Sequence, residues 1–440
     1  MAISTELWRR TVAFDRSAVP EEVWRWAELC VLDWAGCAIA GSEQPIGELL
    51  RAEYAGAPGP AVLIGADPAT ADVPVAALIN GAASHALDFD DSNGTGLGYH
   101  PAAPAVPAAL AIAQAGHASG EDLLAAVVAG YEFSHRVGVA IGGPAAFVKG
   151  WHPTKMLGVF GSLAAAASLM GLAEAEFGSA FGIAASLAGG TQANFGTMTK
   201  PLHPGLAARA GITAARLGRR GITANPEALE ATAGLAELLG DGAVHAEEVH
   251  AWDGQWVIAR NIFKVHAACL GTHASIEAAL AAARDLPVEA IERVAVRINP
   301  RTFRVCRFDV PDTGYEAKFS VRAATALTLL RENTGDPALY SDERVHAEDF
   351  LDMMSRIVVE GDPRLRPRNS DIEITTTGGR TLRAHGDSTI PLTDLVRLRA
   401  RLRAKFQALA EPVIGRARSD ALAERILTLR SAPDVASLAP

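Results

Sequence analysis

The sequence predicts a mainly α-helical protein, with a large all-helical domain and a smaller α+β lid domain inserted into it. Apolar residues recur at helical spacing up to about residue 286, and the pattern then alternates as in strands over residues 291–298 and 370–384. The composition, 49% apolar and 20% charged, is typical of a globular chain, and 440 residues suffice for more than one domain. We therefore expect an all-helical domain over residues 1–286, a lid over 287–390, and C-terminal helices over 391–440 that return to the first domain.

The first domain is predicted as a succession of helices. Residues 21–41 (EEVWRWAELCVLDWAGCAIAG) carry apolar side chains at helical spacing and a glycine near the end. Residues 73–87 form a second such segment, which is followed by the acidic turn DFDD. The other helices are expected over residues 104–114, 120–139, 154–171, 175–188, 207–217 and 272–286.

The lid is predicted from strand-like segments. Residues 291–298 alternate between apolar and polar, and residues 356–359 are apolar and branched. Residues 370–384 read as a hairpin around Gly378-Gly379. A helix is expected between these strands, over residues 320–330, and basic amphipathic helices follow over residues 395–410 and 419–429.

Charge and sequence signals argue against a nucleic-acid-binding, membrane-spanning or secreted protein. A net charge of −10 and a pI near 5.7 argue against nucleic acid as a partner, because phosphate binding needs a basic surface. The uncharged run over residues 156–173 is rich in Ala and Gly, so we expect a buried helix and no membrane span. The N-terminus lacks the order of a secretory signal and the four cysteines form no CxxC pair, which predicts a cytoplasmic protein with reduced thiols.

Three histidines stand directly before prolines. Proline suits the first helical position and disfavours the helical conformation of the preceding residue, so each histidine is expected at or near a helix N-cap. The unsatisfied N–H groups and positive dipole there favour an anion. Three such places predict a pocket for a molecule with several carboxylates. The pairs are His100-Pro101, His152-Pro153 and His203-Pro204.

The acidic turn contains Asp88, Asp90 and Asp91 and leaves several interpretations open. Carboxylates with a histidine could hold a divalent ion, but the chain has no HxxxH or HxH pair and no second acidic cluster. The aspartates could equally be solvated or capping residues. They could also orient catalytic histidines or bind substrate hydroxyls. We expect no metal.

Two lysines lie in unusual surroundings. Lys200 precedes a helix in GGTQANFGTMTKPLHPG, where a lysine is costly unless it is exposed or meets an anion. It is either a surface residue or one that binds a carboxylate or moves a proton. Lys264 belongs to NIFKVHAACLGTH, whose Cys269 and histidines fit no common metal template. A nucleophilic cysteine there would need an identifiable base.

Common cofactor and hydrolase motifs are missing. The sequence contains no phosphate loop, GxGxxG fingerprint, GxSxG elbow or HExxH. Histidines, lysines and polar turns without such a motif indicate acid–base chemistry on an activated C–H bond. No cofactor is expected.

Six segments, in order over residues 30–330, resemble the MmgE/PrpD family. They are ALINGAASHALDFDD, GYHPAAPAVPAALA, GWHPTKMLGVFGSLAAAA, GTMTKPLHPG, KVHAACLGTH and EAKFSVRAA. The resemblance implies a helical domain with an α+β lid and a homodimer. It also implies catalysis without metal or organic cofactor on small di- or tricarboxylates, as in 2-methylcitrate dehydratase, cis-aconitate decarboxylase and iminodisuccinate epimerase.

The resemblance also implies a set of site residues. His152 would move the proton next to a carboxylate, while Lys200 and Lys264 would clamp carboxylates and stabilise an enolate-like charge. His100, supported by Asp88, would act as partner acid or bind the leaving hydroxyl. The catalytic set is then His152, His100, Lys200 and Lys264, and the substrate-binding set is Asp88, Ser92, His203 and Cys269, with His203 also shaping the segment that presents Lys200.

One departure from the family pattern bears on the reaction. The cis-aconitate decarboxylases resemble KRFPAH in the last lysine segment, whereas here Cys269 stands at the position of that histidine and Ala267 replaces the proline. We therefore expect 2-methylcitrate-type dehydration first, with cis-aconitate-type decarboxylation or iminodisuccinate-type epimerisation as alternatives. A catalytically silent carboxylate-binding relative and a metal hydrolase using the DFDD turn are alternatives of other classes.

Overall fold

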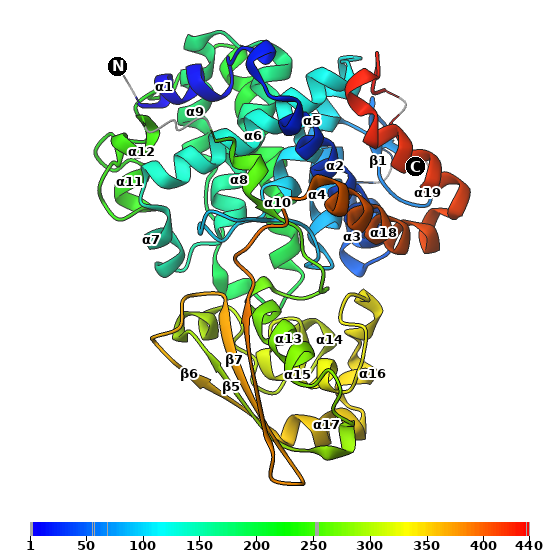
Figure 1. Ribbon diagram of the computed structural model, residues 1–440. Helices are drawn as coiled ribbons and strands as arrows, with labels where there is room; N and C mark the ends of the chain where they lie inside the picture. Colours follow the sequence, from blue (N-terminus) through cyan, green and yellow to red (C-terminus); the bar gives the residue numbers. More distant parts are fainter. Residues whose placement is uncertain are drawn as a thin grey trace.

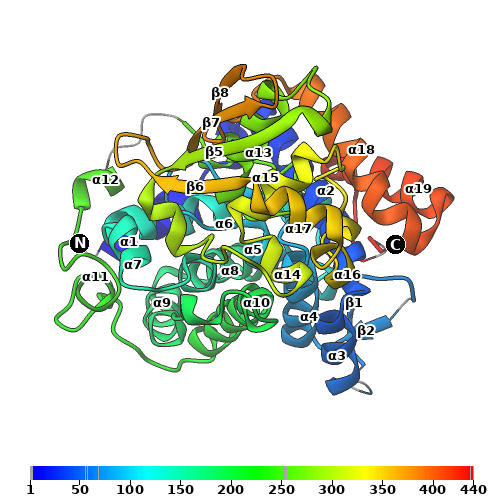
Figure 2. The same ribbon diagram turned by 90° about the horizontal axis from the view of Figure 1, so that it is seen from below.

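The computed structural model describes residues 3–54, 56, 58–67, 69–250, 255–436 and 438–439. The chain is mainly α-helical, as the sequence predicts. Figure 1 shows two units: a large helical unit that contains both ends of the chain, and a smaller unit of strands and helices. In Figure 2, seen from below, the smaller unit lies in front of the helical one.

The helical unit is centred on α8, which packs against α5, α6 and α10. Helix α2 packs against both α4 and α18, so the C-terminal segment returns to this unit. Two short antiparallel pairs, β1 (Ala61–Leu63) with β2 (Ala69–Ala71) and β3 (Ser92–Asn93) with β4 (Asn261–Ile262), complete it. Its helices are α1 (Ile3–Thr11), α2 (Glu21–Ser42), α3 (Pro45–Glu53), α4 (Val73–His85), α5 (Ala102–Ala115), α6 (Gly120–Ala140), α7 (Gly143–Val148), α8 (Pro153–Met170), α9 (Glu174–Leu187), α10 (Thr199–Arg219), α11 (Leu235–Leu238), α12 (Ala246–His250), α18 (Leu395–Ile414) and α19 (Arg416–Leu427).

The uncharged run near residue 160 forms α8, and nearly all of that helix is buried among its neighbours. Its alanines and glycines allow the surrounding helices to approach closely. This confirms the buried core helix that the sequence predicts. Within the described ranges, no helix combines the length and apolar character that crossing a membrane requires.

The smaller unit contains a four-stranded sheet with the order β6-β5-β7-β8. Strands β5 and β6 are parallel, whereas β7 is antiparallel to both β5 and β8. The alternating segments therefore form strands where we predicted them. The elements are α13 (Leu270–Ala282), β5 (Ile291–Ile298), α14 (Gly314–Ala317), α15 (Val321–Leu329), α16 (Asp342–Val345), α17 (Glu348–Ser355), β6 (Ile357–Gly361), β7 (Asn369–Thr376) and β8 (Thr381–Asp387).

Helix α13 packs against β7, β8 and α15, although we expected a helix there to close the helical domain. Its alanines, among them Ala278 and Ala279, share one apolar core with Ile291 and Val294 of β5. Helical periodicity shows that a helix has an apolar face but does not indicate which core that face covers.

The His-Pro pairs differ from one another in structure. His152 is the N-cap of α8, and His100 directly precedes Pro101, the N-cap of α5. The prediction for His203 is wrong, because α10 begins at Thr199 and contains both His203 and Pro204. Pro201 already occupies the first turn of α10, where a missing N–H is tolerated, so Pro204 does not mark the start.

Helices α4 and α10 cross at a pair of glycines. A Cβ added to Gly81 would lie 2.9 Å from the Cα of Gly205, and one added to Gly205 would lie 2.2 Å from the carbonyl oxygen of Leu78. Only glycine permits so close an approach. The crossing brings the start of α10 next to the C-terminal end of α4.

We predict that Gly205→Ala lowers the free energy of unfolding by about 3 kcal/mol, because the added methyl group must push two backbones apart. Urea unfolding followed by circular dichroism measures the change. Gly116→Ala is the control, since the nearest atom to its Cβ lies at 3.4 Å and its φ of −100° suits alanine. Equal stability of the Gly205 and Gly116 variants would contradict the close-crossing interpretation.

Candidate active site

A cavity of about 210 Å³ is lined by residues of both units. A larger cleft of about 910 Å³ elsewhere contains Lys264 but none of the other predicted site residues, so the smaller cavity is the candidate site. Lys264 and His203 do not line the smaller cavity. They contact Asp88 and His152, which do line it. Six predicted residues do line it: Asp88, Ser92, His100, His152, Lys200 and Cys269.

Asp88 is the buried centre of the site, with a φ of 52° just after α4. Its Oδ1 accepts from Lys200 Nζ at 2.6 Å and from Lys264 Nζ at 3.0 Å, and its carbonyl oxygen accepts from Lys264 Nζ at 2.7 Å. Burial raises the pKa of Asp88, but the two ammonium groups outweigh it and hold this pKa well below the usual range. Asp88 is therefore ionised, and its carboxylate bonds to the two lysines, whereas we expected it to support His100.

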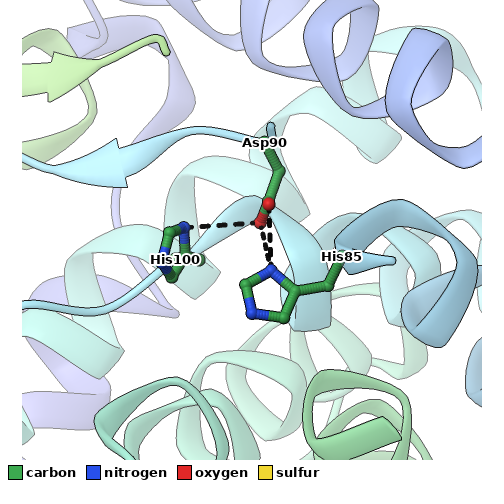
Figure 3. Close-up of side chains that lie close together, drawn as sticks. All are labelled: His85, Asp90 and His100. Atoms are coloured by element: carbon green, nitrogen blue, oxygen red, sulfur yellow. Dashed lines mark hydrogen bonds and ion pairs between the residues drawn. The ribbon is translucent and has the colours of Figure 1, made fainter. Parts of the chain in front are cut away.

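That supporting role falls to Asp90, as Figure 3 shows. The carboxylate of Asp90 lies 2.8 Å from Nδ1 of His85 and 3.4 Å from Nδ1 of His100. Nδ1 of His100 also donates to the carbonyl oxygen of Asp91. Because a carbonyl oxygen only accepts, His100 carries its proton on Nδ1, which leaves Nε2 as the basic nitrogen.

His85 is a site residue that our sequence reasoning missed. Its Nδ1 donates to Asp90, and its Nε2 accepts from Lys200 Nζ at 3.0 Å. Its place at the end of a helix, five residues before Asp90, is the signal that could have revealed it. Asp90, His85, Lys200 and Asp88 thus form one continuous hydrogen-bonded chain.

Lys200 is not a surface residue. It lies in the first turn of α10, and only 3% of it is exposed. Its Nζ lies 5.0 Å from the ring centre of Phe319 and 5.9 Å from that of Phe195. The alternative of a solvated lysine is thereby excluded, and its ammonium group faces the cavity.

His85, Asp90 and His100 are the described residues best arranged to hold a metal ion, with one ligand atom of each within 4.8 Å of the others. However, Nδ1 of both histidines carries a proton in this arrangement, and Nε2 of His85 is bonded to Lys200. A ligand nitrogen needs a free lone pair. Of the four imidazole nitrogens, only Nε2 of His100 keeps a free lone pair, and the other three join the side chains into a hydrogen-bonded network that orients two imidazoles.

His152 forms a second imidazole pair. Its Nδ1 lies 2.8 Å from Nδ1 of His203, so one ring donates and the other accepts. Burial, followed by the charge of Lys200, holds the pKa of His152 well below its usual range, and burial lowers the pKa of His203 to about 4. Within the described chain, Nε2 of His152 has no hydrogen-bond partner. His152 is thus a neutral imidazole at the cavity wall.

Asp91 belongs to the support behind the site. Its carboxylate accepts from the Tyr131 hydroxyl at 2.6 Å and from Asn261 Nδ2 at 2.7 Å. Burial raises the pKa of Asp91 to about 7. The three aspartates of one turn therefore have three different environments, which their spacing alone did not indicate.

The C-terminal helix α18 supports the site from behind. Lys405 Nζ donates to Asp33 Oδ1 at 2.6 Å and to the carbonyl oxygens of Phe89 and Lys264 at 2.6 and 3.2 Å. It also lies 4.0 Å from the ring centre of Phe89. One side chain of α18 therefore holds the acidic turn against the lysine segment.

Cys269 is the N-cap of α13 and lines the cavity beside the buried Cys306. A hydrogen bond from the Cys306 thiol lowers the pKa of Cys269. The neighbouring His266 and His273 do not line this cavity. His266 bonds to Thr334 and Glu277, and His273 donates to main-chain carbonyls.

Known protein families match most of both units. The model of the MmgE/PrpD N-terminal domain matches residues 7–248, and that of the MmgE/PrpD C-terminal domain matches residues 266–429. Cis-aconitate decarboxylases of Mus musculus and Homo sapiens are each 31% identical to this chain, over 71% of it and 67% of their own length. A cis-aconitate decarboxylase-like protein of Aspergillus oryzae is 30% identical over 68% of this chain and 67% of its own.

These matches agree with the resemblance seen in the sequence segments. The second family model begins at residue 266, just before α13, in agreement with the packing of that helix on the smaller unit. The protein belongs to the MmgE/PrpD family.

Proposed function

We propose that the protein is a cofactor-independent lyase that moves a proton at the carbon next to a carboxylate of a small di- or tricarboxylate. The observation that carries this proposal is the pair of neutral imidazoles, His152 and His100, on a cavity that also holds the ammonium group of Lys200. A neutral imidazole can accept a proton, and a buried cation stabilises the negative charge that develops on the carboxylate.

Dehydration of a 2-methylcitrate-like hydroxy acid remains our first choice. With Nδ1 of His152 donating to His203, its Nε2 would accept the proton from carbon. The same imidazolium can return that proton to the departing hydroxide, so that water leaves and a carbon–carbon double bond forms. His100, whose Nε2 is free to interact, would bind the hydroxyl.

Lys264 acts differently from Lys200 in this proposal. It does not line the cavity, and it donates twice to Asp88. The charges of Asp88 and Asp90 raise its pKa in spite of burial, so it stays an ammonium group. Lys264 is therefore a positioning residue that holds Asp88, and through it Lys200.

Decarboxylation of cis-aconitate is the second candidate, favoured by the names of the relatives at 30–31% identity. Loss of carbon dioxide would leave a carbanion that takes a proton from an imidazolium or from Lys200. Cys269 lines the cavity at the position where the decarboxylase segment resembles KRFPAH and has a histidine, and this departure counts against decarboxylation. A homodimer and a cytoplasmic location remain predictions.

A panel of 2-methylcitrate, cis-aconitate and iminodisuccinate, followed by proton NMR, distinguishes these reactions. We expect loss of water from 2-methylcitrate, seen as a new vinylic or allylic signal. Release of carbon dioxide from cis-aconitate would favour the second candidate, and epimerisation of iminodisuccinate would favour the third family activity. Binding without turnover of any compound would identify a silent relative.

His152→Ala should lower kcat by about 10²–10⁴-fold through loss of the base. Lys200→Met should lower it by about 10²–10³-fold through loss of charge stabilisation. Steady-state kinetics and a thermal melt measure activity and folding. His117→Ala is the matched control, because that histidine is 74% exposed. Wild-type activity in a folded His152 variant would overturn the proposed role.

The pH profile provides a separate check. Burial depresses the pKa values of His152 and His100, so both imidazoles stay neutral as pH falls through 6.5, the ordinary histidine pKa. We expect kcat/KM to remain constant from pH 7.5 to 6.5 and to be lost only at lower pH, as the bases become protonated. An acid limb centred at 6.5 would indicate a solvated base elsewhere.

A further inference from the structure

Two arginines of the smaller unit line the same cavity as the imidazoles. Arg301 lies in the short helix Pro300–Arg304, and Arg368 immediately precedes β7. Within the described chain, neither guanidinium group has a hydrogen bond or an ion pair. The other charged side chains of the lining are Asp88 and Lys200, which pair with each other at 2.6 Å. Arg301 is exposed and Arg368 is half-buried, and their guanidinium groups are the charged groups of this lining that have no partner of opposite charge.

Neighbouring arginines are bonded. Arg304 donates to the carbonyl oxygen of Val148 at 2.9 Å, and Arg307 donates to that of Phe195, so both join the two units. On the segment before β7, the guanidinium of Arg364 pairs with Asp362 at 2.7 Å, and that of Arg366 pairs with Asp387 at 3.2 Å. Among these six arginines, the two without a side-chain partner in the described chain are the two that line the cavity.

The backbone of Arg368 is also unusual. Its φ is 66°, in the left-handed region that residues other than glycine rarely adopt. Asp88, in the helical unit, has a φ of 52°. The carbonyl oxygen of Arg368 accepts from both N and Oγ of Ser388, at 3.1 and 3.2 Å, which holds this conformation. Such strained residues cluster at binding sites because other contacts must maintain them.

We propose that Arg301 and Arg368 bind the carboxylate groups of the substrate that are remote from the reacting carbon. A guanidinium group matches a carboxylate with two parallel N–H donors, which suits a site for a planar anion. The inner part of the cavity provides Lys200 for one carboxylate. The two arginines then select molecules with at least two carboxylates over monocarboxylates. This inference rests on the proposed function, since it assigns the substrate class of the same site.

The test uses the full-length protein with Arg301→Met, Arg368→Met, the double variant and Arg368→Lys. Arg364→Met is the matched control on the same segment, because its side chain is 87% exposed and pairs with Asp362. Calorimetry measures binding of tricarballylate, glutarate and butyrate. Kinetics then separates KM from kcat on whichever panel compound is turned over.

We expect each Met variant to raise the Kd for tricarballylate by at least about tenfold, as for loss of a charge-assisted hydrogen bond. KM should rise in parallel, while kcat changes less than about threefold, since remote binding is equal in ground and transition states. Arg368→Lys should bind more tightly than Arg368→Met but less tightly than the wild type. If Arg368→Met does not fold, Arg368→Lys alone tests the role of Arg368. Arg364→Met should bind as the wild type does.

The outcomes separate this inference from the proposed function. Wild-type binding in the double variant, with turnover intact, overturns the arginine assignment and leaves the lyase proposal standing. Arginine-dependent binding without turnover of any compound supports the arginine assignment and counts against the lyase. A wild-type protein that binds no polycarboxylate overturns both.

Discussion

The site depends on one buried carboxylate, Asp88, held between the ammonium groups of Lys200 and Lys264. Removing one partner from such a buried cluster leaves an uncompensated charge, at a cost of about 3–5 kcal/mol. The three residues come from the end of α4, the start of α10 and the segment before α13. The cluster therefore joins three distant parts of the chain, and the glycine crossing of α4 and α10 is the packing that permits it.

Both lysine ammonium groups are buried and pair with Asp88. The same burial lowers the pKa of the histidines and keeps their imidazoles neutral. In a medium of low dielectric, an imidazole stays neutral unless an anion compensates its charge. Asp90 is such an anion, yet it is shared between His85 and His100, and burial still lowers the pKa of both rings. Its main effect is to place the protons on Nδ1. A charged ammonium group and neutral imidazoles thus lie on one cavity.

Much of this arrangement could be predicted from sequence. The apolar period located the helices and the strand Ile291–Ile298, and the family segments brought His100, His152 and Lys200 to one site. The start of α10 was missed because two prolines stand close together there. Arg301 and Arg368 could not be found, because no local pattern relates residues that only tertiary packing brings to the same wall. Lys264 was predicted as a catalytic residue, and only the structure shows that its side chain contacts Asp88 without lining the cavity.

Lys405 connects two segments that lie far before it in the sequence. The acidic turn and the lysine segment are both held by this one side chain of α18, which lies near the end of the chain. In the sequence, the acidic turn and the lysine segment both precede α18, which begins at Leu395. During synthesis, the acidic turn and the lysine segment are therefore made before the side chain that bonds to both, so this contact can form only after α18 has been synthesised.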